Sequence, residues 1–170
     1  YRDCIAEIRK YDKNHMISIE GHQWAANPYV FCEPYDDNVC FHFHRYCCPP
    51  RKRLLDMFLD VRERMNKPLY LGESGENSSA WYAAMYPLCA DFDIGYNIWC
   101  FKKMQTANSP YSIPMPENWD RITDYIAGGP QPSAEEAQRI FDALLENCKI
   151  ENCTYQPDVI PSITRRPGSA

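Results

Sequence analysis

The segment KPLYLGESGEN, residues 67–77, carries the strongest structural signal in the sequence. The apolar run at residues 69–71 follows a proline and is typical of a strand buried on both faces. The run ends abruptly at Gly72, so Glu73 should stand at the carboxyl end of that strand. In folds that alternate strands and helices, the loops that leave this edge surround the active site. Glu73 is therefore either a catalytic carboxylate or a residue that caps the next helix.

Helical and strand patterns alternate along the chain. The spacing of apolar residues predicts helices over residues 2–11, 51–65, 79–92, 117–126 and 133–147, and strands over residues 15–20, 39–44, 67–73 and 94–99. Strands that alternate with helices pair in parallel through right-handed crossovers. Two α/β architectures fit this order, namely an open doubly wound sheet and half of an eight-stranded barrel. No glycine-rich phosphate motif follows a strand, which disfavours a nucleotide-binding sheet.

Length and composition predict one globular domain, or a large part of one. The chain has 170 residues, of which 45% are hydrophobic, and it can bury a sizeable core. We assign residues 1–150 to the domain and the proline-containing residues 151–170 to a strap or linker. The first residue is Tyr1 rather than Met, and the chain opens inside a helical pattern, so we expect it to be internal to a longer protein.

Charge and hydropathy exclude two classes of partner. The formal net charge is -5 and no basic stripe is present, which argues against nucleic-acid binding. No stretch approaches the roughly 18 consecutive apolar residues of a membrane span. We therefore expect neither a nucleic acid nor a membrane as partner.

The nine cysteines favour an oxidising compartment, and we expect a secreted, extracellular protein. They show no Cys-x-x-Cys or Cys/His spacing of a zinc site, so we expect no metal. Cys148 and Cys153, just after a predicted helix, are predicted to form a disulfide. Cys47 and Cys48 are adjacent and could bond each other only with strain.

Polar and aromatic side chains gather where the predicted strands end. His44 and Tyr46 end the second strand, Glu73 the third and Trp99 the fourth, while Trp24 follows the first. Indole rings stack on the apolar faces of sugars while polar groups bind the hydroxyls, so this set predicts a carbohydrate site. Two alternatives remain: Trp99 as a core residue, and His44 as a buried histidine with its hydrogen bonds satisfied.

Several motifs in the sequence resemble those of a known enzyme family. Four stretches carry this resemblance: His-Arg-Tyr in VCFHFHRYCCP, Gly-Glu-Ser-Gly in LYLGESGEN, the tryptophan of IGYNIWCFKKM, and SPYSIPMPENWDRITDY. Over residues 1–126, the sequence resembles the C-terminal half of family 5 glycoside hydrolases. This is the cellulase family of retaining (β/α)8 barrels. The resemblance implies an α/β fold that is the C-terminal half of a TIM barrel, with about four parallel strands alternating with helices. It implies hydrolysis that needs no cofactor.

The resemblance also implies catalytic roles. Glu73 would be the nucleophile, with His44 and Tyr46 hydrogen-bonded to nucleophile and substrate. Retaining cleavage also needs a second carboxylate about 5 to 5.5 Å away that protonates the leaving oxygen. In the family that glutamate follows an asparagine at the fourth strand, and no such pair precedes the first helix here, so we expect the acid/base residue and the N-terminal half of the barrel to lie outside this chain. Glu20 is an alternative acid to which the resemblance gives no proton-transfer role.

Three further residues would bind substrate by the same resemblance: Trp99, Trp24 and Lys103. The sequence thus predicts part of a secreted retaining glycoside hydrolase acting on cellulose, another β-glucan or β-mannan, with the fragment alone inactive on polysaccharide. The alternative is a non-catalytic carbohydrate-binding protein or pseudoenzyme that keeps the aromatic residues. The residue at the end of the fourth strand in the parent protein would distinguish the two.

Overall fold

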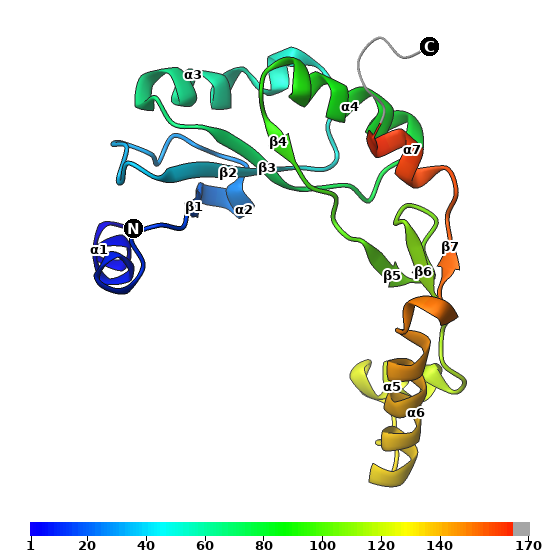
Figure 1. Cartoon of the computed structure of the whole chain (residues 1–170). Helices are drawn as coiled ribbons and strands as arrows, with labels where there is room; N and C mark the ends of the chain where they lie inside the picture. The colour runs from blue at the N-terminus through cyan, green and yellow to red at the C-terminus, as the bar shows by residue number, and fades with distance from the viewer. Residues whose placement is uncertain (165–170) are drawn as a thin grey trace. The chain divides into compact units, whose positions relative to one another are not determined.

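A computed structural model describes residues 1–164 and divides the chain into two compact units (Figure 1). The first unit is Tyr1–Trp99 with the described residues 161–164, and the second is Cys100–Ile160. Residues beyond Thr164, with Pro167 of the predicted strap, lie outside the described part of the chain. Among the described helices, none is both long and apolar enough to cross a membrane.

The first unit contains a sheet of four parallel strands in the order β1-β2-β3-β4. The strands are β1 (Ile17–Glu20), β2 (Val39–Arg45), β3 (Leu69–Ser74) and β4 (Gly95–Tyr96). The helices are α1 (Arg2–Tyr11), α2 (His22–Ala25), the 3-10 helix η1 (Lys52–Leu54), α3 (Asp56–Met65) and α4 (Ser79–Asp91), and α7 (Val159–Thr164) closes the described chain. Parallel strands that alternate with helices confirm the predicted α/β fold, the architecture of half a (β/α)8 barrel.

The core of this unit lies between the sheet and helices α3 and α4, which run along one face (Figure 1). In β2, Phe41 and Phe43 point to this face and alternate with two histidines that point to the other. The Phe43 ring stacks on Phe58 of α3 at 4.2 Å between centroids. Burying each such aromatic ring contributes about 1.5–3 kcal/mol, so this alternation fixes which face of β2 packs against the helices.

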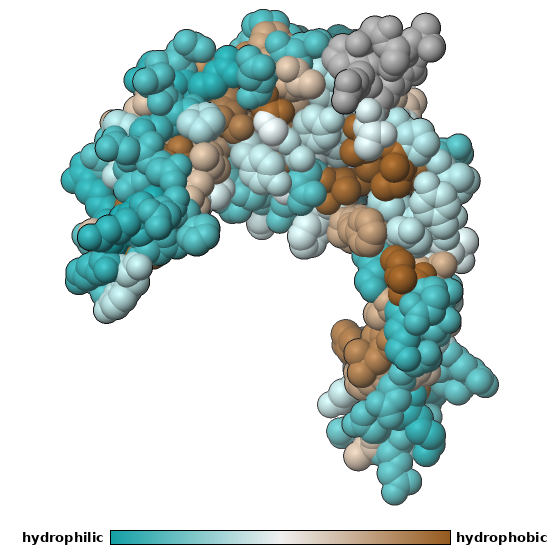
Figure 2. All heavy atoms as spheres, in the orientation of Figure 1, coloured by the Kyte–Doolittle hydropathy of each residue, from teal (hydrophilic) through white to brown (hydrophobic). Residues whose placement is uncertain are grey.

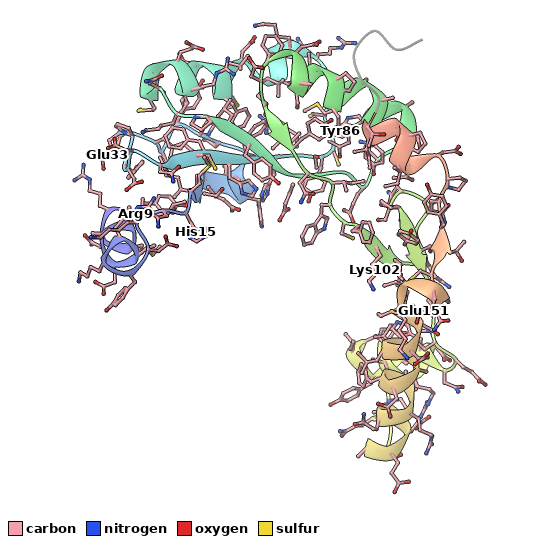
Figure 3. The ribbon with its side chains drawn as sticks, in the orientation of Figure 1. Arg9, His15, Glu33, Tyr86, Lys102 and Glu151 are labelled. Carbon is pink, nitrogen blue, oxygen red and sulfur yellow. The ribbon has the colours of Figure 1, made fainter. Side chains whose placement is uncertain are left out.

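Arg9 fastens α1 to the segment that precedes β2 (Figure 3). Its guanidinium donates to Asp36 at 2.7 and 3.0 Å and to the Asn38 carbonyl at 3.2 Å. The hydrogen bond from Arg9 holds the pKa of Asp36 at about 2, with help from the Asn38 main-chain amide. The first helix is thus tied to the strand that carries the candidate site.

Helix α4 packs through its aromatic residues. The Tyr86 hydroxyl, labelled in Figure 3, lies 3.0 Å from Ser74 Oγ at the end of β3. Burial raises the pKa of Tyr86 well above its ordinary value, so the hydroxyl stays neutral. Pro87 stands within the helix, and α4 continues to Asp91.

Two predicted elements differ in extent. The strand expected over residues 94–99 is only Gly95–Tyr96, followed by an isolated bridge between Gly75 and Trp99. The helix expected over residues 51–65 begins as η1 and becomes α-helical only at Asp56.

The second unit contains a small mixed sheet and two helices. Strand β6 (Tyr111–Ile113) lies between β5 (Lys102–Met104), parallel to it, and β7 (Thr154–Tyr155), antiparallel. The helices are α5 (Trp119–Ile126), α6 (Ala134–Asn147) and the 3-10 helix η2 (Ile150–Asn152). Ser133 caps α6, its hydroxyl accepting from the Glu136 amide at 3.1 Å. Figure 2 shows hydrophobic residues at the surface of this unit, where Ile126 is 77% exposed.

All nine cysteines are free, so the predicted disulfide between Cys148 and Cys153 is wrong for this structure. Cys148 ends α6 in a helical conformation, and η2 stands between the two residues. The Cys153 thiol donates instead to main-chain carbonyls, at 3.3 Å to Lys149 and 3.5 Å to Asn147. The two cysteines are close in sequence, but they do not form a disulfide in this structure.

Candidate active site

A β-bulge at Gly72 turns Glu73 toward the face of the sheet that carries the histidines. Phe43 pairs with Leu71, but the next residue, His44, pairs with Glu73, so Gly72 is the extra residue of β3. Because side chains alternate between the faces of a strand, Glu73 would otherwise share the helix-covered face with Leu71. Bulges re-aim side chains in this way beside active sites.

Glycine suits position 72 because the His42 ring occupies the space that a side chain would take. A Cβ added to Gly72 would lie 2.0 Å from His42 Nε2. A glycine within a strand often marks such a close approach. Position 72 therefore fixes both the bulge and the place of the imidazole.

The carboxylate of Glu73 is held by two residues from the end of β2. Tyr46 Oη donates to Glu73 Oε2 at 2.7 Å, and His44 Nδ1 lies 3.4 Å from the same oxygen. The loop of Tyr46 is tied in turn to the loop after β3, because Asn77 Nδ2 donates to the Tyr46 carbonyl at 3.2 Å. The structure thus brings together three of the predicted site residues, with the Glu73 side chain 31% exposed.

Arg45, between the two residues that contact Glu73, faces the protein. Its guanidinium donates to the Leu54 carbonyl at 3.3 Å and lies 4.3 Å from the centre of the Phe58 ring. This cation–π contact and the hydrogen bond anchor the end of β2 to the helical layer. The alternation His-Arg-Tyr therefore places the first and third residues toward Glu73.

A second histidine, His42, extends the site beyond the predicted residues. Its Nε2 lies 3.0 Å from His44 Nε2, and its Nδ1 lies 3.5 Å from Glu20 Oε1. Glu20 Oε1 is also 3.6 Å from His44 Nε2, the ring nitrogen opposite the one that faces Glu73. Burial lowers the pKa of His42, against an opposing effect of Glu20, and favours the neutral imidazole. The period-2 spacing of His42 and His44 was the signal that could have found this residue.

A pocket of about 500 Å³ opens beside Glu73, within the size range of ligand sites. It lies between α2 and the end of β2, and its lining includes Trp24, His44, Tyr46, Cys47 and Glu73.

Trp24 reaches this pocket from a strained turn. Gln23, Trp24 and Ala25 have φ of 54°, 51° and 57°, although none is a glycine. Left-handed backbone costs about 1–2 kcal/mol for each such residue. Hydrogen bonds in both directions between His22 and Asn27 close the turn and hold it, and the Trp24 side chain is left 89% exposed. Strain of this kind concentrates at ligand-binding sites.

Trp99 is not a core residue, so that alternative is wrong. The residue is 48% exposed, and its amide donates to the Ser74 carbonyl at 2.7 Å, which sets it directly beside the loop that follows Glu73. Lys103 lies on β5 in the second unit, and its part in a substrate subsite stays a prediction.

The sheet, the bulge and the carboxylate at the strand end define a glycoside hydrolase barrel segment, and the chain belongs to the cellulase family, glycosyl hydrolase family 5. The model of that family matches residues 1–105. The resemblance stated from the motifs is thereby confirmed. No curated protein matches the chain significantly.

Two solved structures show the same fold. The Clostridial cellulose synthase subunit Z from Clostridioides difficile is 13% identical, with a TM-score of 0.63 over 96% of this chain and 54% of that one. An endoglucanase is 15% identical, with a TM-score of 0.50 over 71% of this chain and 48% of that one. The chain thus spans about half the length of these solved proteins.

Proposed function

We propose that the chain is part of a retaining glycoside hydrolase that cleaves β-linked polysaccharide, such as cellulose, another β-glucan or β-mannan, by double displacement. The observation that carries the proposal is the Glu73 carboxylate at a strand end, hydrogen-bonded by Tyr46 at 2.7 Å beside an open pocket. Membership of the cellulase family supports glycoside hydrolysis. Polysaccharides are too large to cross a cell membrane, so action outside the cell is part of the proposal.

In the first step, a Glu73 oxygen attacks the anomeric carbon and the glycosidic bond breaks, leaving a glycosyl ester on Glu73. Tyr46 and His44 both contact Oε2, so both hold the carboxylate through the same oxygen. That arrangement orients the carboxylate with Oε1 directed to the sugar. Exposed indoles at Trp24 and Trp99 would stack on neighbouring sugar rings.

The leaving oxygen needs a proton from a second carboxylate. Glu20 does not face Glu73, because the His44 ring lies between the two carboxylates. Glu20 is near Nε2 of that ring, and Glu73 is near Nδ1. We therefore assign the acid/base role to a residue outside this chain, in the remaining part of the barrel. The length of the solved proteins, of which the chain spans about half, supports this assignment.

The test is an assay of the parent protein on a panel of β-glucans and β-mannans, with the anomer of the first product followed by NMR. Release of the β-anomer supports double displacement, whereas first release of the α-anomer contradicts retention. Binding of the glycans without hydrolysis of any would favour the non-catalytic carbohydrate-binding protein.

Tyr46→Phe in the parent protein should lower kcat by about 10- to 100-fold. The substitution keeps the ring and removes only the hydroxyl, and a hydrogen bond to a charged group is worth about 1.5–3 kcal/mol. Steady-state rates on a soluble β-glucan measure the effect. Tyr11→Phe is the matched control, because that side chain is 85% exposed on α1 and should leave kcat unchanged. Equal rates for both variants would contradict a role for the Tyr46 hydroxyl in catalysis.

A further inference from the structure

We propose that Glu20, His42 and His44 form a binding site for a divalent transition-metal ion of the zinc class, on the sheet face that carries Glu73. One donor atom from each residue lies within 4.8 Å of the other two. The proposal does not depend on the hydrolase activity, since it has a binding readout of its own, and His44 is the one residue that it shares with the catalytic site.

The distances between the donor atoms suit a single small ion. The two Nε2 atoms of His42 and His44 are 3.0 Å apart, Glu20 Oε1 is 3.6 Å from His44 Nε2, and the same oxygen is 3.5 Å from the other ring nitrogen of His42, Nδ1. Ligands bound to Zn²⁺ at about 2.0–2.1 Å in a tetrahedral arrangement lie about 3.3 Å from one another. An ion could therefore replace the contact between the two imidazoles with little movement of the rings.

The backbone presets these ligands. Glu20 and His42 are direct partners in the parallel pairing of β1 and β2, and His42 and His44 are two residues apart on one face of β2. Gly72 leaves the space in which the His42 ring lies. Because two rigid strands hold the three residues, an ion would find most of its ligands already in place.

The donor chemistry selects the kind of ion. Two imidazoles with one carboxylate suit Zn²⁺, Cu²⁺ and Ni²⁺, whereas Mg²⁺ and Ca²⁺ prefer oxygen ligands. Three protein ligands leave a fourth position for water, as in known His₂Glu sites. The side chain of Glu20 is 46% exposed, so solvent reaches this ligand.

The surrounding groups fit a metal site as well. Histidines that bind a metal usually donate their second ring N–H to an oxygen. His44 Nδ1 is 3.4 Å from Glu73 Oε2, and His42 Nδ1 is 3.4 Å from Ser18 Oγ. An ion on the two Nε2 atoms would leave the Nδ1–H of His44 directed at Glu73, so occupancy of the site would be coupled to the orientation of that carboxylate.

The experiment is calorimetric titration of Zn²⁺ into the purified 170-residue chain after removal of metals with a chelator. We expect one site that saturates, no heat with Mg²⁺, and weaker binding in His42→Gln. Changes outside the ligand shell typically cost about 10- to 100-fold in affinity, so loss of a ligand should cost at least that much. Glu20→Gln, at a half-exposed position, provides a second variant with little risk to folding, which circular dichroism checks.

Two controls separate this site from other metal-binding groups. Replacing His15 and His22, the other two histidines, with Gln should leave the affinity unchanged. Because the nine cysteines are free, Co²⁺ is titrated as well: nitrogen and oxygen ligands give weak visible bands, and thiolates give strong near-ultraviolet bands. Thiolate bands on the site that saturates, or unchanged affinity in both His42→Gln and Glu20→Gln, would overturn the proposal.

Discussion

Glu73→Gln in the parent protein should reduce turnover on polysaccharide by about 10⁴-fold or more, an effect of the size seen when a covalent nucleophile is removed. The amide has the size of the carboxylate but cannot form the glycosyl ester. Glycan affinity should change little, because the exposed indoles of Trp24 and Trp99 are untouched. Initial rates measure the first effect, and calorimetry with an oligosaccharide measures the second.

Glu76→Gln is the matched control for that experiment. It makes the same chemical change three positions further along, in the loop that follows β3, on an exposed residue, and should leave the rate as it is. Should Glu73→Gln turn over substrate at a rate near that of Glu76→Gln, the assignment of the nucleophile would be wrong.

Gly75→Ala should destabilise the protein by about 2–4 kcal/mol, the sum of a strained backbone and a broken contact. Gly75 has φ of 148°, and a Cβ there would lie 2.3 Å from the Trp99 carbonyl oxygen. Since that oxygen belongs to the main chain, relief requires the bridge between the two residues to open. Urea unfolding followed by circular dichroism gives the change in free energy.

Gly128→Ala separates the two contributions. Gly128 also has positive φ, at 96°, but a Cβ there would meet nothing within 4 Å. It should show only the cost of the backbone conformation, and so a smaller loss of stability than Gly75→Ala. Equal losses would mean that the contact with Trp99 contributes nothing.

Local signals predicted most of the first unit. The spacing of apolar residues predicted β2 and, in the second unit, α6 to within one residue at each end. The short strands of the second unit were missed, because two or three residues are too few for a readable alternation. The predicted disulfide was wrong because the spacing of two cysteines in the sequence does not determine how their side chains are oriented.

In the site, Glu73, His44 and Tyr46 were predicted from their positions at strand ends, because the carboxyl ends of parallel strands lie at one edge of the sheet. Pairing register is a relation between distant residues, so neither the bulge at Gly72 nor the pairing of Glu20 with His42 could be read from the chain. The left-handed turn at Trp24 was also hidden, because no glycine marks it.

The close approach of His42 to Gly72 links two positions that are thirty residues apart in the sequence. A side chain at position 72 requires the His42 ring to move away or residue 42 to become smaller. The two positions should therefore vary together rather than independently during divergence.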